Sequence, residues 1–175
     1  DYTLPPDHIA QTPVEPRDAS RLLVLQRSTG KVEHRRFRAI GDYLDAGDLL
    51  VVNRSRVIPA RLPARKLPGG GKDELLLLAR IEAGLWRAIV GGKGLRAGKQ
   101  VELLNGLRAE IVEELEGAQR VLRFERPLGE DLDQLGQTPL PPYIQEELKQ
   151  PERYQTVYSR EPGSAAAPSC TPLLN

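Results

Sequence analysis

The residues best suited to chemistry lie in one short stretch, where polar side chains follow an apolar run. Asn53, Ser55 and Arg56 come after four apolar residues at 49–52. A short apolar run behind a Gly-Asp turn predicts a strand buried on both faces, as in a parallel sheet covered by helices. The carboxyl end of such a strand is where α/β folds usually place a site. These three polar residues are therefore candidate catalytic residues, and the alternative is an ordinary solvated loop.

The composition excludes several classes of protein. The 175 residues are 39% apolar and 28% charged, which is typical of a soluble globular protein. The single cysteine, Cys170, excludes an internal disulfide and favours a reducing, cytoplasmic setting. One cysteine with His8 and His34 cannot build a structural zinc site, so no metal is expected. No apolar run approaches the roughly 20 residues that a membrane-spanning helix needs.

Charge is unevenly distributed along the chain, although the net charge is only +1. Residues 21–99 hold 17 of the 25 Lys and Arg and 7 of the 24 Asp and Glu, a net charge of +10. The remaining residues hold 8 basic and 17 acidic side chains, a net charge of −9. This separation points to an anionic partner for the basic part. The alternative is that the basic and acidic segments neutralise each other in the folded protein.

The middle of the chain alternates between extended segments and turns. Asn105-Gly106, between two of these segments, is the strongest short hairpin signal. The rhythm predicts five or six antiparallel strands in a small barrel or sandwich. The expected strands cover residues 60–67, 73–81, 85–90, 100–104, 107–115 and 120–125.

The flanking segments have a mixed pattern. Residues 21–25 and 32–36 are predicted to pair as a hairpin, and 38–45 is predicted to be an amphipathic helix. Further helices are expected at 130–135, and from Pro151 through Tyr158. The pattern therefore predicts an α/β domain with an inserted antiparallel β-domain, a small barrel or sandwich. The inserted domain spans residues 62–137, and residues 1–61 and 138–175 belong to the α/β domain, which has too few strands here to close a sheet.

Six short stretches in a fixed order carry a family resemblance. Any one alone would be weak, but six in order over almost the whole chain are highly specific. They read GDLLVVN at 47–53, SRVIPARL at 55–62, ELLL at 74–77, PLPPYI at 139–144, RYQTVYS at 153–159 and GSAAAP at 163–168. Together they resemble the S-adenosylmethionine:tRNA ribosyltransferase-isomerase family of queuosine biosynthesis.

The resemblance implies an activity and two substrates. The family transfers and isomerises the ribosyl moiety of S-adenosylmethionine onto 7-aminomethyl-7-deazaguanine in tRNA, giving epoxyqueuosine-tRNA, while adenine and methionine leave. S-adenosylmethionine is then the ribosyl donor, and tRNA is the partner. The family fold, an α/β barrel-like domain carrying a small β-barrel, is similar to the architecture expected above.

The resemblance makes several residues candidates for binding the ribosyl donor, S-adenosylmethionine. Polar donors such as Asn53, Ser55 and Arg56 suit a dry pocket in which charge develops. Glu74 could orient a ribose hydroxyl or act as a base, and the alternative is a charge at a strand edge. Tyr154 and Tyr158, expected at i and i+4 on one helix face, either pack or line the pocket. Small residues that permit close approach of a ligand complete the set, namely Ala166, Ala167 and Pro168.

Four basic residues are candidate contacts to tRNA phosphates, which set affinity but carry no sequence information. They are Arg61, Arg65, Lys66 and Lys93. The alternative is that all four belong to a solvated surface.

The sequence departs from the family pattern after Pro168. Family members are roughly twice as long and continue there with Thr-Ala-Gly-Leu-His-Phe-Thr, whereas Ser169-Cys170-Thr171 follows here. The chain is therefore expected to be incomplete. Two other functions stay open, a non-catalytic basic RNA-binding β-module and an inactive truncated paralogue.

Overall fold

The computed structural model describes residues 3–92 and 94–165, which fall into two compact units. Among these residues the larger unit comprises 55–140 and 161–165, and the smaller unit comprises 3–54 and 141–160. Neither unit is continuous in sequence, because each is interrupted by a segment of the other.

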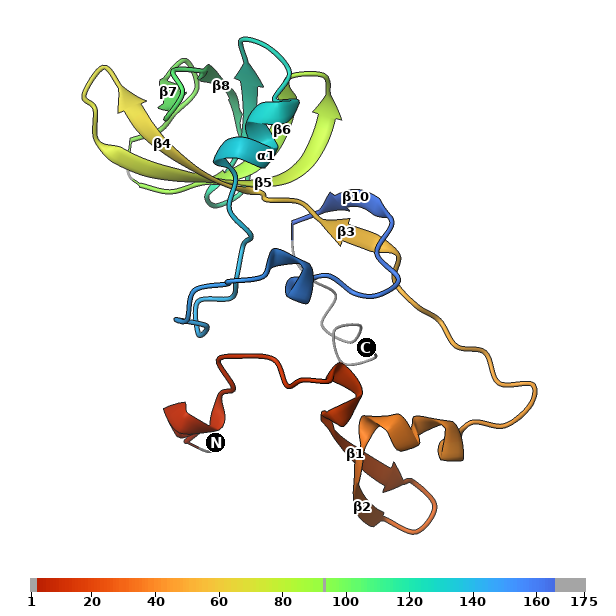
Figure 1. Cartoon of the computed structure of the whole chain (residues 1–175). Helices are drawn as coiled ribbons and strands as arrows, with labels where there is room; N and C mark the ends of the chain where they lie inside the picture. The colour runs from red at the N-terminus through yellow and green to blue at the C-terminus, as the bar shows by residue number, and fades with distance from the viewer. Residues whose placement is uncertain (1–2, 93, 166–175) are drawn as a thin grey trace. The chain divides into compact units, whose positions relative to one another are not determined.

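A closed antiparallel barrel forms the centre of the larger unit (Figure 1). Its strands are β4 (Arg61–Leu67), β5 (Lys72–Glu82), β6 (Leu85–Val90), β7 (Gln100–Leu103), β8 (Arg108–Glu114) and β9 (Gln119–Phe124). They follow the order β4-β5-β6-β9-β8-β7, and the antiparallel pairing of β7 with β4 closes the barrel. The expected antiparallel β-barrel is confirmed, with six strands.

Alternation of side chains fills the barrel interior. Along β6, Trp86, Ala88 and Val90 are buried, whereas Arg87 and Ile89 between them are exposed. Successive side chains of a strand point to opposite faces, so each strand contributes every second residue to the core. The largest fully buried side chains are Leu62, Leu75, Leu77, Val101, Ile111 and Leu122.

A short helix, α1 (Glu130–Leu135), covers part of the barrel. A helix is expected from the sequence at these residues. Its Leu132 and Leu135 pack against the barrel core. Asp131, 7% exposed, accepts hydrogen bonds from the Arg126 guanidinium and, at 2.5 Å, from Asn105 Nδ2 in the β7–β8 turn. These hydrogen bonds, that from Arg126 above all, hold the pKa of the Asp131 carboxyl below its ordinary value.

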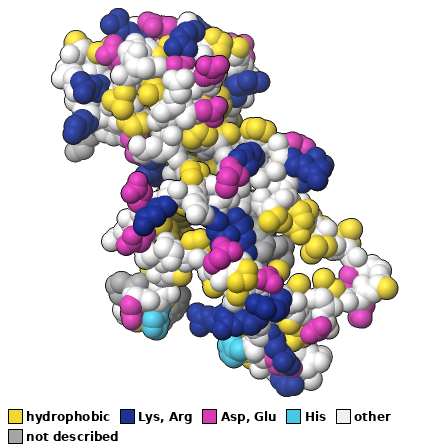
Figure 2. Space-filling view, viewed as in Figure 1, with side chains coloured by type: hydrophobic (Ala, Val, Ile, Leu, Met, Phe, Trp, Pro, Cys, Tyr) yellow, Lys and Arg dark blue, Asp and Glu magenta, His cyan; other side chains and the backbone are white. Residues whose placement is uncertain are grey.

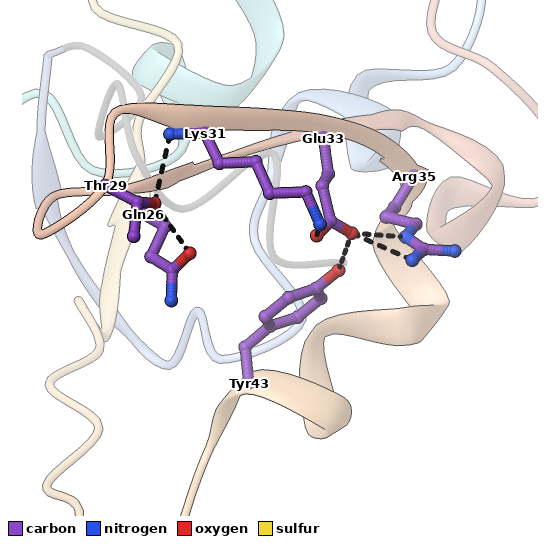
Figure 3. Close-up of polar contacts among 6 residues, drawn as sticks. All are labelled: Gln26, Thr29, Lys31, Glu33, Arg35 and Tyr43. Atoms are coloured by element: carbon purple, nitrogen blue, oxygen red, sulfur yellow. Dashed lines mark hydrogen bonds and ion pairs between the residues drawn. The ribbon is translucent and has the colours of Figure 1, made fainter.

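The smaller unit contains a two-stranded hairpin, β1 (Arg21–Gln26) and β2 (Lys31–Arg36), as predicted. Glu33 lies at the centre of a polar cluster on one face of this hairpin (Figure 3). Its carboxylate contacts Lys31 Nζ at 3.0 Å and Arg35 Nη2 at 2.8 Å, and it accepts from the Tyr43 hydroxyl at 3.5 Å. Hydrogen bonds from Lys31 and Arg35 lower the pKa of Glu33.

Polar contacts hold the two segments of the smaller unit together. Arg17 donates from Nη1 to the Gln155 carbonyl at 2.8 Å and from Nη2 to the Glu152 carbonyl at 3.0 Å. Arg153 forms an ion pair with Glu15 at 3.0 Å. The other elements of the smaller unit, among its described residues, are the 3-10 helices η1 (Pro6–His8), η2 (Arg17–Ala19), η3 (Phe37–Tyr43) and η4 (Pro151–Tyr154).

The buried strand expected at residues 49–52 is wrong. These residues form no strand, and Leu49, Leu50 and Val51 are 87%, 55% and 79% exposed. A strand needs a neighbour for its backbone hydrogen bonds. No described residue hydrogen-bonds to the backbone of 49–52, so the apolar run forms no strand, and only Val52 in it is half-buried. Likewise, every buried apolar side chain of the described residues belongs to the larger unit.

Two expected α-helices are also wrong. The helix at 38–45 is the 3-10 helix η3, which contains Gly41, a weak helix former. The helix from Pro151 ends at Tyr154, because Gln155 is extended at φ −87° and ψ 152°. β-branched residues follow at once and disfavour a helix.

The α/β barrel-like domain expected around the β-barrel is not confirmed. Within 3–92 and 94–165, the segments outside the barrel contribute one antiparallel hairpin, one short parallel strand pair and the 3-10 helices, and the described chain has a single α-helix. No helix among these residues is long and apolar enough to cross a membrane.

Candidate functional site

Two of the motif segments, far apart in sequence, meet in a short parallel strand pair of the larger unit. β3 (Ser55–Val57) lies beside β10 (Glu161–Ser164), with Ser55 opposite Glu161 and Arg56 opposite Pro162. The Ile58 amide donates to the Ser164 carbonyl at 2.9 Å and extends the pairing. The register shifts between Pro162 and Ser164, where Gly163 has a φ of +152°. The fold therefore brings the SRVIP motif beside Gly163 and Ser164, the first two residues of the GSAAAP motif.

The three catalytic candidates fall at or just before this pair. Ser55 and Arg56 lie within β3 and are half-buried, whereas Asn53 is exposed in the extended segment that precedes it. Ser55 and Arg56 are consecutive in a strand, so their side chains leave opposite faces and do not converge by backbone geometry alone. Of the three candidates, Arg56 is the one that lies opposite Pro162 of β10.

A hollow of about 480 Å³ adjoins the β3–β10 pair within the larger unit. Ile58, Pro162 and Gly163 form one side of it, and the barrel and the start of α1 form the rest. From the barrel side, Trp86 and Arg80 line it, and Arg80 is its one charged lining residue among those described. Sequence reasoning missed these two residues, because no local pattern distinguishes them from ordinary strand positions.

Glu74 and Arg61 are neighbours on the barrel wall. Arg61 Nε lies 3.5 Å from Glu74 Oε1, and their side chains are 34% and 51% exposed. The same Nε is buried and makes no hydrogen bond of good geometry. Glu74 is a candidate catalytic residue and Arg61 is a candidate contact to tRNA phosphates. In this pair the charge of each side chain partly neutralises that of the other.

Lys66 also forms an ion pair, whereas Arg65 forms none with the described residues, although Glu102 lies opposite it in the β4–β7 pair. Lys66 Nζ lies 3.7 Å from Asp73 Oδ2, and the Asp73 side chain is 2% exposed. The adjacent Arg65 is exposed and forms no ion pair with the described residues. On the face shown in Figure 2, basic and acidic side chains are interspersed over the barrel, while Lys and Arg gather over the β1–β2 hairpin. Lys93 lies outside the described residues.

The predicted tyrosine pair does not share a helix face. Tyr154 ends η4, and Tyr158 follows in irregular chain, both half-buried. Tyr158 borders a small hollow in the smaller unit, together with Val52 and Arg54. Ala166, Ala167 and Pro168 lie outside the described residues. No group of His, Cys, Asp and Glu able to hold a metal occurs within 3–92 and 94–165.

The chain is similar over nearly its whole length to proteins named S-adenosylmethionine:tRNA ribosyltransferase-isomerase. The one from Desulfitobacterium hafniense is 52% identical over 173 residues, covering 97% of this chain and 51% of that protein. The one from Thermotoga maritima is 50% identical over 170 residues, covering 97% and 50%. The chain thus spans about half the length of the curated relatives it matches.

A solved structure and a family model also match. The structure is the crystal structure of S-adenosylmethionine tRNA ribosyltransferase from Thermotoga maritima, 49% identical, with a TM-score of 0.36. The match covers 71% of this chain and 44% of that one. The family model, described as queuosine biosynthesis protein, matches residues 1–172. Because that match spans nearly the whole sequence, the chain belongs to the queuosine biosynthesis protein family.

Proposed function

We propose that this chain serves the transfer and isomerisation of the ribosyl moiety of S-adenosylmethionine onto 7-aminomethyl-7-deazaguanine in tRNA, giving epoxyqueuosine-tRNA. The observation that carries the proposal is the family match over residues 1–172, joined to relatives of about 50% identity that bear the name of this enzyme. Relatives named as enzymes favour catalysis over a purely RNA-binding module. We also propose that the protein is cytoplasmic, which its single cysteine favours.

The residues of the β3–β10 pair support this chemistry. As adenine departs from the ribosyl donor, electron density collects on the leaving group, and fixed hydrogen-bond donors stabilise it. Arg56 has a planar fork of donors on a paired strand, which makes it the best-placed candidate for that role. Asn53, Ser55 and Glu74 stay secondary candidates for orienting the ribose hydroxyls.

Binding of the two substrates is assigned to different residues. Tyr154 and Tyr158, with the small residues Ala166, Ala167 and Pro168, would line the S-adenosylmethionine site. For tRNA, the exposed Arg65 has the strongest case among the basic residues, because Arg61 and Lys66 each form an ion pair with a carboxylate and Arg65 forms none with the described residues. Lys93 stays a candidate on the basis of sequence.

The parallel pairing of β3 with β10 supports an α/β barrel-like domain around the β-barrel. Parallel strands require long crossover connections, and such pairs occur mostly in α/β folds. The barrel itself lies within the connection between these two strands.

Release of adenine tests the proposal. The purified chain is incubated with S-adenosylmethionine and tRNA that carries 7-aminomethyl-7-deazaguanine, and free adenine and methionine are measured by chromatography. The Thermotoga maritima relative serves as a positive control. We expect adenine release that depends on the modified base. An inactive chain beside an active relative would contradict the proposal.

A further inference from the structure

The hollow beside the β3–β10 pair has a lining that none of the assigned roles uses. It is apolar over most of its wall, and residues without bulky side chains, such as Ala79, Gly84 and Gly129, keep it open. Its volume of about 480 Å³ falls within the range of roughly 300–1,000 Å³ that is usual for small-molecule sites. A Cβ placed on Gly163 would meet no atom within 4 Å, so this side of the hollow is open space.

Arg80 is the one cationic residue among the described residues that line this hollow. Arg80 and Trp86 are directly opposite each other in the β5–β6 pair, so their side chains leave the same face of the sheet. Trp86 is 8% exposed and forms part of the wall, whereas Arg80 is exposed. Arg80 forms no ion pair with any described carboxylate, unlike Arg61 and Lys66 on the same barrel.

We propose that this hollow binds one nucleotide of the RNA substrate, with the base among the apolar walls and the phosphate at Arg80. The inference rests on the proposed function, because it assigns a subsite to the tRNA named there. An unstacked base presents a flat apolar ring and hydrogen-bonding edges, and the glycine backbone of the hollow can meet those edges. A guanidinium without a carboxylate partner is suited to a bidentate contact with phosphate.

The charge of the lining favours a nucleotide over S-adenosylmethionine. The sulfonium group is positively charged, and within the described residues the lining includes no Asp or Glu to attract it. A phosphate is negatively charged and lies about one ribose away from its base, which suits an apolar pocket with a cation beside it. The donor is therefore assigned to a different part of the protein from this hollow.

Fluorescence of the single tryptophan provides a direct measurement, because Trp86 is the only Trp in the chain and lies in this wall. The probes are guanosine 5′-monophosphate, a single-stranded RNA decamer, ribose 5-phosphate and S-adenosylmethionine. We expect a saturable change with the nucleotide, tighter binding of the decamer, and none with ribose 5-phosphate, which lacks the base. S-adenosylmethionine should leave the signal unchanged.

Two variants test the assignment, and a third is the matched control. Arg80→Gln should weaken nucleotide binding at least tenfold, and Ala83→Leu, in the exposed β5–β6 turn, should reduce it by filling the hollow. Arg87→Gln removes the same charge next to Trp86 but from the exposed face, and should change nothing. Thermal melts establish that all three variants fold.

Three results would overturn the inference: a signal that saturates with S-adenosylmethionine alone, equal losses for Arg80→Gln and Arg87→Gln, or no response to either nucleotide probe. None of these measurements requires turnover. Nucleotide binding without adenine release would support this site and contradict only the proposed function. Adenine release without nucleotide binding at the hollow would support the proposed function and contradict only this site.

Discussion

Arg56 of β3 lies opposite Pro162 of β10 in a parallel strand pair that joins two distant parts of the sequence. Because proline has no amide hydrogen, the Pro162 nitrogen cannot donate to β3. The Ile58 amide, two residues after Arg56, donates to the Ser164 carbonyl at 2.9 Å. The backbone of Arg56 is thus held against a partner strand that contains the start of a second motif, Gly163 and Ser164.

Arg56→Lys should lower adenine release about a hundredfold, equivalent to about 2.7 kcal/mol of transition-state stabilisation. Lysine keeps the charge but loses the planar fork of donors. The assay is adenine release with modified tRNA, accompanied by a thermal melt. Arg87→Lys, on the exposed face of β6, should behave as the unchanged protein. Normal adenine release with a normal melting temperature would show that Arg56 has no role in catalysis. Loss of adenine release with a much lower melting temperature would show that Arg56 stabilises the fold.

The salt dependence of tRNA binding should distinguish Arg65 from its ion-paired neighbours. Each phosphate contact contributes about 0.9 to the slope of log affinity against log salt. Arg65→Gln should therefore flatten the slope by about one unit. The double change Arg61→Gln and Lys66→Gln should flatten it by less than the roughly two units expected for free cations, because Glu74 and Asp73 lie beside them.

The measurement is filter binding or fluorescence anisotropy with unmodified tRNA over a series of salt concentrations. Arg123→Gln, an exposed residue on β9, is a control for the general loss of charge. An unchanged slope for Arg65→Gln would show that this side chain does not contact phosphate.

Asp131 should make the barrel sensitive to acid. The hydrogen bond from Arg126 lowers the pKa of Asp131 in the folded protein. Its contribution to stability is therefore full above the unfolded pKa of about 3.9, and is lost as the pH falls through the lower folded value. Asp131→Asn should lower the urea midpoint at pH 7, and the gap to the unchanged protein should shrink below about pH 4.

Asp133→Asn is the matched control, because Asp133 is exposed in the same first turn of α1. It should leave the urea midpoint at pH 7 almost unchanged. A gap between Asp131→Asn and the unchanged protein that is constant from pH 7 to pH 2 would show that ionisation of Asp131 does not stabilise the barrel.

Gly92→Ala should destabilise the barrel more than Gly94→Ala. Both glycines have positive φ values, +77° and +85°, so alanine strains each backbone by roughly 1–2 kcal/mol. A Cβ at Gly92 would also collide with Lys66 Nζ and displace it from Asp73, whereas a Cβ at Gly94 meets nothing within 4 Å. Urea denaturation of both variants measures the difference. Equal losses would show that the Lys66–Asp73 pair adds no stability.

The sequence alone determined the parts of the fold that depend on neighbouring residues. Asn105-Gly106 marked the β7–β8 hairpin, because a tight turn depends on the two residues that form it. The succession of extended segments and turns identified the barrel strands, and the helix predicted at 130–135 is α1. The family motifs likewise identified the family from the sequence, since they require no knowledge of contacts.

Only the tertiary structure decided which segments find partners. Residues 49–52 have the composition of a buried strand, yet no described residue pairs with their backbone, and Leu49, Leu50 and Val51 lie exposed. Two residues further on, Ser55 and Arg56 belong to β3, because β10 supplies the parallel neighbour. A strand exists only where another strand accepts its hydrogen bonds, and that neighbour can come from any distance along the chain. Strand pairing likewise places Arg80 and Trp86 at the hollow, and no local sequence pattern predicts that position.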